Sequence, residues 1–396
     1  MTLDLDRLRA DTPGCARVLH LDNAGSALPP APVLEAMLAH LRREAEIGGY
    51  AAAAEAEPLL EGAYASIARL IGAQPDEIAM MENATRAWDM VFYGLPFRRG
   101  DRILTAKAEY ASNTISYLQV AQRTGAVVEV VPDDESGQLD VAALERAVTA
   151  ADRGPARLIA VSHIPTNGGL VNPAAAIGKI ARAHSIPYLL DACQSVGQMP
   201  VDVEAIGCDM LSATARKFLR GPRAVGFLYV RRSMLERIDP PFLDLHAAEM
   251  VAPDRYVVRP DARRFENFER NFVGIIGMAA AADYALTLGL DAIRDRARTL
   301  ADRLRDGLSA LPGVTVRDKG AERSAIVSFT KAGEPAETLH QRLRAAGINT
   351  SVTRRRSTMF DMTDRGLDAM LRASPHYYNS EAEIERFVAA VGGREG

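Results

Sequence analysis

Short apolar runs rich in β-branched residues alternate with amphipathic segments between about Asp76 and Val230. This alternation predicts a mostly parallel sheet, because each crossover between parallel strands needs a helix that covers one face of the sheet. Seven runs are predicted to be strands: Glu77–Met81, Arg102–Thr105, Val127–Val131, Arg157–Ser162, Tyr188–Leu190, Met210–Ser212 and Val225–Val230. The predicted helices between them include Arg86–Leu95, Asn113–Arg123, Val141–Ala150 and Pro173–Ala183. We therefore expect an α/β fold that binds its ligand at the carboxyl ends of the strands.

The pattern changes after about Leu290, which predicts a second domain in this chain of 396 residues. A long charged helix, Asp291–Leu311, is expected there, followed by two strands and two more helices. These are predicted at Gly313–Arg317, Ala325–Thr330, Pro335–Ala346 and Ser380–Val391. We expect an N-terminal segment over residues 1–28, a large domain over residues 29–289 and a smaller α+β domain over residues 290–396.

Charge and cysteine content narrow the possible partners. The formal net charge of −4 offers no electrostatic reason to expect nucleic acid or a membrane surface. The first residues are charged, so they do not resemble a signal peptide, and the weakly polar stretch from Gly274 to Leu290 is predicted to be a buried helix. The three cysteines lack the paired spacing of metal ligands. We expect a cytoplasmic protein without a metal site.

Lys217 and Asp191 suggest a cofactor. Asp191 ends a buried apolar run, and Lys217 follows it by 26 residues in a turn that contains Ser212 and Thr214. A lone lysine after a strand is usually a solvated surface residue. An acidic partner on a neighbouring strand changes that interpretation, because pyridoxal phosphate (PLP) needs a lysine for its Schiff base and a carboxylate for its pyridine nitrogen.

The whole chain, from His20-Leu-Asp-Asn-Ala-Gly-Ser to Tyr377-Tyr-Asn-Ser-Glu, resembles class V of the fold-type I PLP enzymes. This group contains cysteine desulfurases, selenocysteine lyases, isopenicillin N epimerases and several C–S lyases. The resemblance implies a large PLP-binding domain with a mostly parallel seven-stranded sheet and a smaller C-terminal domain. It also implies a homodimer whose active site lies at the subunit interface, and an N-terminal segment that closes over that site.

The resemblance assigns the cofactor residues by position. Lys217 forms the Schiff base, Asp191 pairs with the pyridine nitrogen, and Gln194 contacts the phenolate oxygen. Phosphate is expected at the helix start that carries Ala84 and Thr85, and at Thr214, because a helix N-terminus offers free N–H groups. Three positions depart from the usual pattern: Tyr110 replaces a stacking histidine, Arg216 replaces a histidine before the lysine, and Thr166 replaces an asparagine. Arg216 can pair with phosphate. Whether Thr166 or Asn167 contacts the cofactor stays open.

Other residues imply an amino-acid substrate. Arg372 matches the arginine that binds the substrate α-carboxylate, for which a planar guanidinium is well suited. Asn23, Ala24 and Gly25 resemble the segment that closes over this carboxylate.

The segment Ser351–Thr358 contains no thiol, although desulfurases carry a nucleophilic cysteine in the corresponding loop. Arg354–Arg356 in this segment form either an anionic-substrate pocket or a charged surface loop.

The stretches Glu44–Tyr50 and Glu266–Glu269 resemble lyases that cleave cysteine conjugates, including ergothioneine-type sulfoxide lyases. We therefore expect a β-eliminating C–S lyase in which Lys217, Asp191 and Tyr110 are catalytic, Tyr110 as the acid for the leaving group. The alternatives are a racemase or epimerase, then an aminotransferase or a desulfurase-like activity, and last a scaffold without activity.

Overall fold

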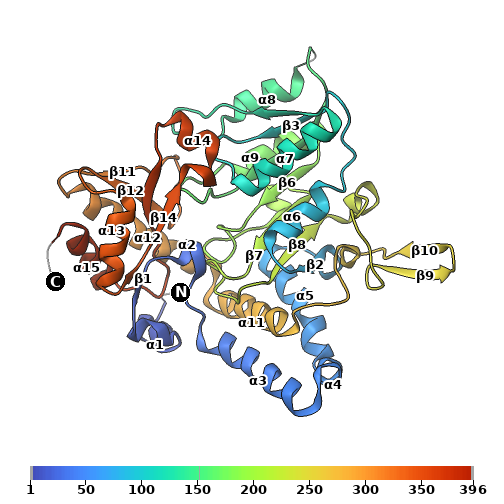
Figure 1. Ribbon diagram of the computed structural model, residues 1–396, viewed down its shortest axis with the longest axis horizontal. Coiled ribbons are helices and arrows are strands. Elements are labelled where there is room, and N and C mark those ends of the chain that lie inside the picture. Colours follow the sequence, from blue (N-terminus) through green and yellow to red (C-terminus); the bar gives the residue numbers. More distant parts are fainter. Residues whose placement is uncertain (1–2, 151, 394–396) are drawn as a thin grey trace.

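The computed structural model describes residues 3–150 and 152–393, in which a seven-stranded sheet forms the centre of a large α/β unit (Figure 1). All seven predicted strands are present, in the spatial order β2-β8-β7-β6-β5-β3-β4. Their bounds are β2 Ile78–Met81, β3 Arg102–Thr105, β4 Val127–Val130, β5 Ala156–Ser162, β6 Tyr188–Asp191, β7 Met210–Thr214 and β8 Gly226–Val230. Only β8 runs antiparallel to its neighbours β2 and β7, so the mostly parallel sheet is confirmed.

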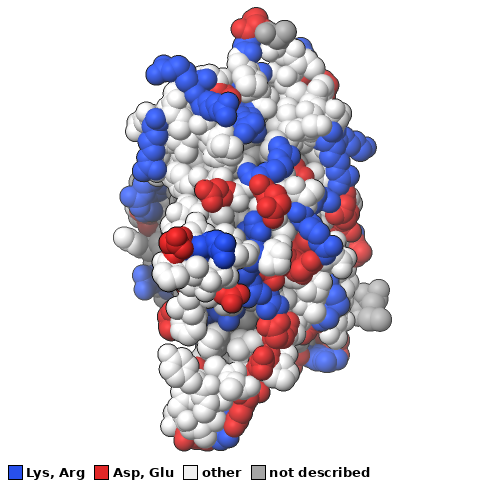
Figure 2. All heavy atoms as spheres, turned by 90° about the vertical axis from the view of Figure 1, so that its right-hand side faces the viewer, with Lys and Arg blue, Asp and Glu red and all other residues white. Residues whose placement is uncertain are grey.

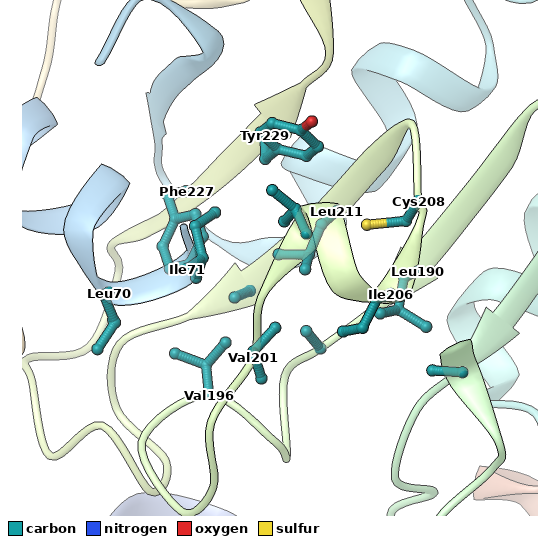
Figure 3. Packing of buried hydrophobic residues seen from close by; sticks show 14 of the residues in the cluster. Leu70, Ile71, Leu190, Val196, Val201, Ile206, Cys208, Leu211, Phe227 and Tyr229 are labelled. Atoms are coloured by element: carbon teal, nitrogen blue, oxygen red, sulfur yellow. The ribbon is translucent and has the colours of Figure 1, made fainter. Parts of the chain in front are cut away.

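Helices cover both faces of this sheet, because successive residues of each strand point to opposite sides. Leu189 belongs to the core cluster that contains Trp88, whereas Leu190 belongs to the cluster that contains Ile71. Figure 3 shows part of this second cluster, in which Leu190 lies beside Ile206, and Phe227 lies beside Ile71. Helices α6 Ala84–Phe92 and α7 Ala111–Thr124 cover the first face. Helices α5 Glu57–Ile71, α8 Val141–Thr149, α9 Ala174–Ala183, α10 Val203–Ile206 and α11 Phe272–Leu288 cover the second.

Helix α11 is the predicted buried helix, and it packs against α5 and against α3, Ala31–Ile47. The short helix α4, Gly49–Glu55, joins α3 to α5. Among the residues that the structure describes, no single helix is long and apolar enough to cross a membrane. Helices α11 and α12 (Leu290–Ser309) meet that criterion only as a pair, and they are bent by 83° relative to each other.

A hairpin that the sequence did not predict projects from the large unit (Figure 1). It consists of β9 Ala248–Ala252 and β10 Arg255–Val258, and its apolar side chains Met250, Tyr256 and Val257 are exposed. Lysine, arginine and acidic side chains are interspersed on the face of the molecule shown in Figure 2.

The smaller unit contains a four-stranded antiparallel sheet in the order β11-β12-β15-β14. Its strands are β11 Val314–Val316, β12 Val327–Lys331, β14 Ser351–Arg354 and β15 Ala369–Ala373. The predicted helices are present as α12, α13 Ala336–Ala345 and α15 Glu381–Val391, and α14 covers Met359–Asp364. The two strands predicted in this region are confirmed, but β14 and β15 were missed. Residues 351–354 were expected in a loop; they form an edge strand instead, because they pair with β15.

The N-terminal residues pack on the smaller unit. Strand β1 (Leu19–His20) pairs in parallel with β13 (Ile348–Asn349), and Leu19 and Leu21 belong to the core cluster of that unit. Helix α1 covers Leu5–Ala10 and α2 covers Asn23–Ser26. Short 3₁₀ turns occur at Pro13–Ala16, Pro75–Glu77, Arg232–Arg237, Ala262–Phe265 and Arg355–Ser357. The domain boundaries given above stay a prediction.

Candidate active site

A cavity of about 220 Å³ opens at the carboxyl ends of the central strands. All nine residues predicted to contact the cofactor line it: Ala84, Thr85, Tyr110, Thr166, Asp191, Gln194, Thr214, Arg216 and Lys217. They gather here because parallel strands end on the same edge of the sheet. Asp191 is the last residue of β6, Thr214 is the last residue of β7, and the register places Ser162 beside Asp191. Their functional roles stay predictions.

Asp191 is buried, and both of its carboxylate oxygens are held. Its Oδ1 accepts a hydrogen bond from the Cys193 backbone N–H at 2.9 Å, and its Oδ2 accepts one from the Asn113 side-chain amide at 3.0 Å. Lys217 lies in the loop after β7 and faces the same cavity, where burial lowers the pKa of its amine. The cavity therefore joins a fixed carboxylate to an amine that loses its proton more easily than an exposed lysine does.

The start of helix α6 suits a phosphate group. Asn83 caps this helix by accepting a hydrogen bond from the Arg86 N–H at 3.0 Å, and Ala84 and Thr85 supply the first N–H groups. The first N–H groups of a helix have no partner within the helix, so they can bind an anion. Thr214, whose hydroxyl donates only a long 3.5 Å bond to the Val225 carbonyl, also lines the cavity.

These residues fit PLP. Besides the helix start, the lysine and the carboxylate, Gln194 places a buried side-chain oxygen at this cavity that has no hydrogen-bond partner among the described residues. A buried polar atom without a partner is costly, so its position suggests a place for a ligand group. When bound, PLP would be held by Lys217, by Asp191, by the α6 start and by Thr214.

Arg216 reaches towards the N-terminal segment. Its Nη1 donates to the Gly25 carbonyl at 2.7 Å, and burial lowers the pKa of its guanidinium. Gln194 contacts the same segment, since its Nε2 donates to the Ala24 carbonyl at 3.0 Å. Phosphate binding by Arg216 stays a prediction, because in this structure its guanidinium bonds to the segment expected to cover the substrate.

Arg372 lies on β15 at the edge of the cavity, and acceptors surround it. Its Nε donates to Ser351 Oγ at 3.0 Å, and its Nη1 donates to the carbonyl and hydroxyl oxygens of Thr166, both at 2.9 Å. Its Nη2 donates to Asp22 Oδ1 at 3.1 Å. Asn23 is buried beside this cluster and donates to the Ser374 carbonyl at 2.7 Å. Three of the four residues predicted to bind the substrate thus contact cavity residues: Arg372 contacts Thr166, Ala24 contacts Gln194, and Gly25 contacts Arg216. The fourth, Asn23, bonds to Ser374 and Tyr378.

Thr166 and Asn167 point to different places. Thr166 lines the cavity, whereas the Asn167 side chain donates to Asp361 at 2.7 Å. The three arginines at residues 354–356 are not among the cavity residues. Arg354 pairs with Glu337 at 3.2 Å and Arg355 with Asp368 at 2.7 Å, which favours the charged-surface interpretation.

The cysteines have different environments. Cys208 lies in the main core, and Cys15 is half-buried in the N-terminal region. Cys193 also is buried, but it lines the cavity, which the sequence did not indicate. Burial raises the pKa of the Cys193 thiol, so the thiol stays protonated at neutral pH and is a weak nucleophile.

Sequence reasoning missed three residues near the site: Glu109, Asn113 and Asp22. Glu109 and Asn113 flank Tyr110 with a spacing of four residues at a helix start, a spacing that brings two side chains together. This spacing was the signal that the sequence offered for Glu109 and Asn113. The sequence offered no signal for Asp22, because its partner Arg372 is 350 residues away in the chain.

Comparisons with known proteins agree with this geometry. Residues 19–387 match the model of the family described as aminotransferase class-V. A probable cysteine desulfurase from Pyrococcus abyssi is 30% identical over 394 residues, which cover 97% of this chain and 96% of the relative. The apo structure of a cysteine desulfurase from Thermococcus onnurineus superposes with a TM-score of 0.91, at 28% identity and 99% coverage of both chains. The cystine C–S lyase C-DES, solved with its product cysteine persulfide, has a TM-score of 0.85 at 25% identity, covering 97% of this chain and all of that chain.

Proposed function

Because the chain belongs to the aminotransferase class V family of PLP enzymes, we propose that it is a C–S lyase acting on an L-amino acid. The reaction is β-elimination: the bond between the β-carbon and sulfur breaks, the sulfur leaves as a thiol, and water converts the remainder to pyruvate and ammonium. One observation carries this proposal. The cavity joins Lys217 and Asp191, but the thiol beside them, Cys193, is buried and protonated.

Bound PLP supplies the electron sink for this chemistry, since it withdraws electrons from the α-carbon of an attached amino acid. Lys217 removes the α-proton; its lowered pKa increases the fraction of free amine at neutral pH. The Asp191 carboxylate lines the cavity, where two donors fix its orientation so that it would pair with the pyridine nitrogen. Tyr110, which lines the cavity and is 38% exposed, would give a proton to the departing sulfur.

Arg372 would orient the substrate. Its guanidinium would bind the α-carboxylate between Thr166 and Ser351, the side chains that already fix its direction. A planar guanidinium with two parallel donors orients a carboxylate as well as binding it. The segment that contains Asn23, Ala24 and Gly25 covers this position and limits the access of water.

We further propose that the protein is a homodimer. Helices α3, α4, α5 and α11 line a largely apolar groove of about 620 Å³, and Leu59 on its rim is 61% exposed. An apolar groove of this kind is typical of a surface that is covered by a partner. A Leu59→Glu variant is expected to shift the sedimentation coefficient from dimer to monomer, whereas a Leu245→Glu variant, changed at another exposed leucine, is not.

A second candidate, cysteine desulfurase, has two observations in its favour: Cys193 lies at the cavity, and several relatives are named probable cysteine desulfurases. The two reactions give different products. A desulfurase yields alanine and a persulfide on the protein, whereas the lyase yields pyruvate and ammonium.

The deciding experiment compares the wild type with a variant in which Cys15, Cys193 and Cys208 are serine. Both proteins are incubated with L-cysteine, S-alkyl cysteines, cysteine sulfoxides and cystine, and pyruvate, ammonium, alanine and protein-bound persulfide are measured. The lyase proposal expects pyruvate from both proteins. Alanine with persulfide, abolished in the triple variant, would establish the desulfurase; substrate recovered only as its enantiomer would establish a racemase, and a keto acid formed only with an amino-group acceptor would establish an aminotransferase.

A further inference from the structure

Two buried carboxylates are joined by one side chain: Asp191 lines the cavity, and Glu109 lies behind it. The Asn113 amide nitrogen donates one hydrogen bond to Asp191 Oδ2 and another to Glu109 Oε1, each at 3.0 Å. A primary amide has two N–H donors, so this bridge uses both. Glu109 itself is 1% exposed and does not line the cavity.

Glu109 is held by more donors than Asn113 alone. Its carboxylate accepts hydrogen bonds from the Tyr110 N–H at 2.8 Å, from the Ser162 N–H at 2.9 Å and from the Ser162 hydroxyl at 2.5 Å. A weaker bond comes from the Thr105 hydroxyl at 3.3 Å. These donors belong to the end of β3, the end of β5 and the start of α7. Glu109 therefore ties two strand ends to the helix that begins beside Tyr110.

We propose that Glu109 is a positioning residue that fixes Asp191 and Tyr110 relative to each other and strengthens the negative potential at Asp191. Through Asn113 it orients the Asp191 carboxylate, which would pair with the pyridine nitrogen of bound PLP. Through the Tyr110 N–H it fixes the aromatic ring on the cavity wall. The role is independent of which bond the enzyme breaks, because every reaction of this site uses Asp191.

The charge of Glu109 depends on pH. Burial raises the pKa of Glu109 to about 7, although its hydrogen bonds oppose this shift. The other titratable groups that face this carboxylate pair are Tyr117 on α7, Tyr188 on β6, Cys193 after β6 and Lys217 after β7. Burial raises the pKa of both tyrosines and of the thiol, so these three groups stay neutral near pH 8. The effect of Glu109 is therefore largest above pH 7, where its carboxylate is ionised.

The test uses the PLP-loaded protein and its visible absorbance. In Glu109→Gln one negative charge near Asp191 and Lys217 is lost, which makes protonation of any nearby group less favourable. The midpoint of the pH titration of the cofactor band is expected to move by about one unit to lower pH. The dissociation constant of PLP is expected to rise about three- to tenfold. Glu109→Asp, which keeps the charge, is expected to restore the midpoint in part.

Asp318→Asn is the matched control. Asp318 is also a buried carboxylate that accepts from two backbone N–H groups and a serine hydroxyl, but its ion pair with Arg305 lies in the smaller unit. It is expected to lower the melting temperature without moving the absorbance midpoint. If Glu109→Gln does not fold, Asn113→Ala removes the bridge but keeps both carboxylates. It is expected to raise the dissociation constant of PLP about three- to tenfold, and an unchanged constant would overturn the proposal. An unchanged midpoint in folded Glu109→Gln, or an equal change in Asp318→Asn, would also overturn it.

Discussion

The guanidinium of Arg372 lies 3.1 Å from the carboxylate of Asp22, so an acidic side chain of the protein occupies part of the site where a substrate α-carboxylate is expected to bind. Asp22 is 26% exposed at its side chain and sits in the N-terminal segment next to Asn23–Gly25. A substrate carboxylate must share Arg372 with Asp22 or displace it. This contact therefore weakens carboxylate binding and at the same time holds the N-terminal segment against β15.

The first prediction concerns Asp22→Asn. Removal of a like charge from a partly exposed carboxylate site is expected to tighten amino-acid binding about two- to fivefold. L-Alanine, which carries no leaving group, would be titrated against the cofactor absorbance. Arg372→Ala is expected to weaken the same binding about ten- to hundredfold, because a charge-assisted bidentate pair is lost. The surface variant Asp368→Asn, changed at a carboxylate that pairs with Arg355, serves as control. Weaker binding in Asp22→Asn would show that Asp22 orients Arg372 and does not compete.

Lys217→Ala is expected to abolish turnover and the pH-dependent absorbance of the bound cofactor. PLP is expected to remain bound, because Thr85, Thr214 and Asp191 still face the cavity. The measurements are product formation, the visible spectrum and PLP content after gel filtration. The matched variant Lys179→Ala removes a lysine on helix α9 and should keep both turnover and spectrum. Turnover at the wild-type rate in Lys217→Ala would refute the assignment of the site.

Arg220 lies in the loop that carries Lys217 and connects this loop to residues near both ends of the chain. Replacement of Arg220 tests how these contacts hold the loop. Its guanidinium donates to the Leu28 carbonyl, the Tyr377 hydroxyl and the Thr12 hydroxyl, and it stacks on Tyr378. Arg220→Ala is expected to lower the free energy of unfolding by about 2–4 kcal/mol, since buried acceptors lose their donor.

The backbone at Arg220 has a φ of 65°, in the left-handed region that favours glycine. Arg220→Gly loses the same contacts as Arg220→Ala but avoids the strain of a β-carbon. It is expected to be more stable than Arg220→Ala by about 1 kcal/mol in urea unfolding. An alanine variant as stable as the glycine variant would mean that this backbone geometry carries no strain.

The buried side chain of His163 leads us to expect that the free energy of unfolding falls in acid. Its side chain is buried, its Nδ1 has no hydrogen-bond partner among the described residues, and burial lowers its pKa from 6.5 to about 4. The unfolded chain therefore binds a proton between pH 6.5 and 4 that the folded protein does not bind. The free energy of unfolding must fall as pH decreases through this window, by on the order of 3 kcal/mol.

The measurement is the free energy of unfolding against pH for the wild type and His163→Leu, with His184→Leu at an exposed position as control. His163→Leu is expected to show a smaller slope between pH 6.5 and 4. An unchanged slope would assign the acid sensitivity to other groups.

The sequence predicted the central sheet well, and its failures have physical causes. Strands such as Tyr188–Asp191 are buried on both faces, so they appear as uninterrupted apolar runs. Strand β14 was not predicted, because an edge strand beside solvent tolerates polar residues such as Ser351 and Arg354. Strand β15 was not predicted, because Arg372 interrupts its apolar pattern. The partners that stabilise Arg372, such as Ser351 and Asp22, come from distant segments of the chain.

The linear sequence determined that Lys217 and Asp191 meet at one edge of a parallel sheet, because strand alternation and helix crossovers are local patterns, and parallel strands end on the same edge. The family resemblance pointed to the helix start at Ala84 and Thr85, whereas the sequence pattern placed the helix at Arg86–Leu95; the structure begins it at Ala84, with Asn83 as its cap. The tertiary structure alone decided that Asp22 contacts Arg372, that Cys193 faces the cavity, and that Asn113 bridges Glu109 to Asp191. These contacts join side chains from elements far apart in the chain, and their geometry depends on packing, which no local pattern encodes.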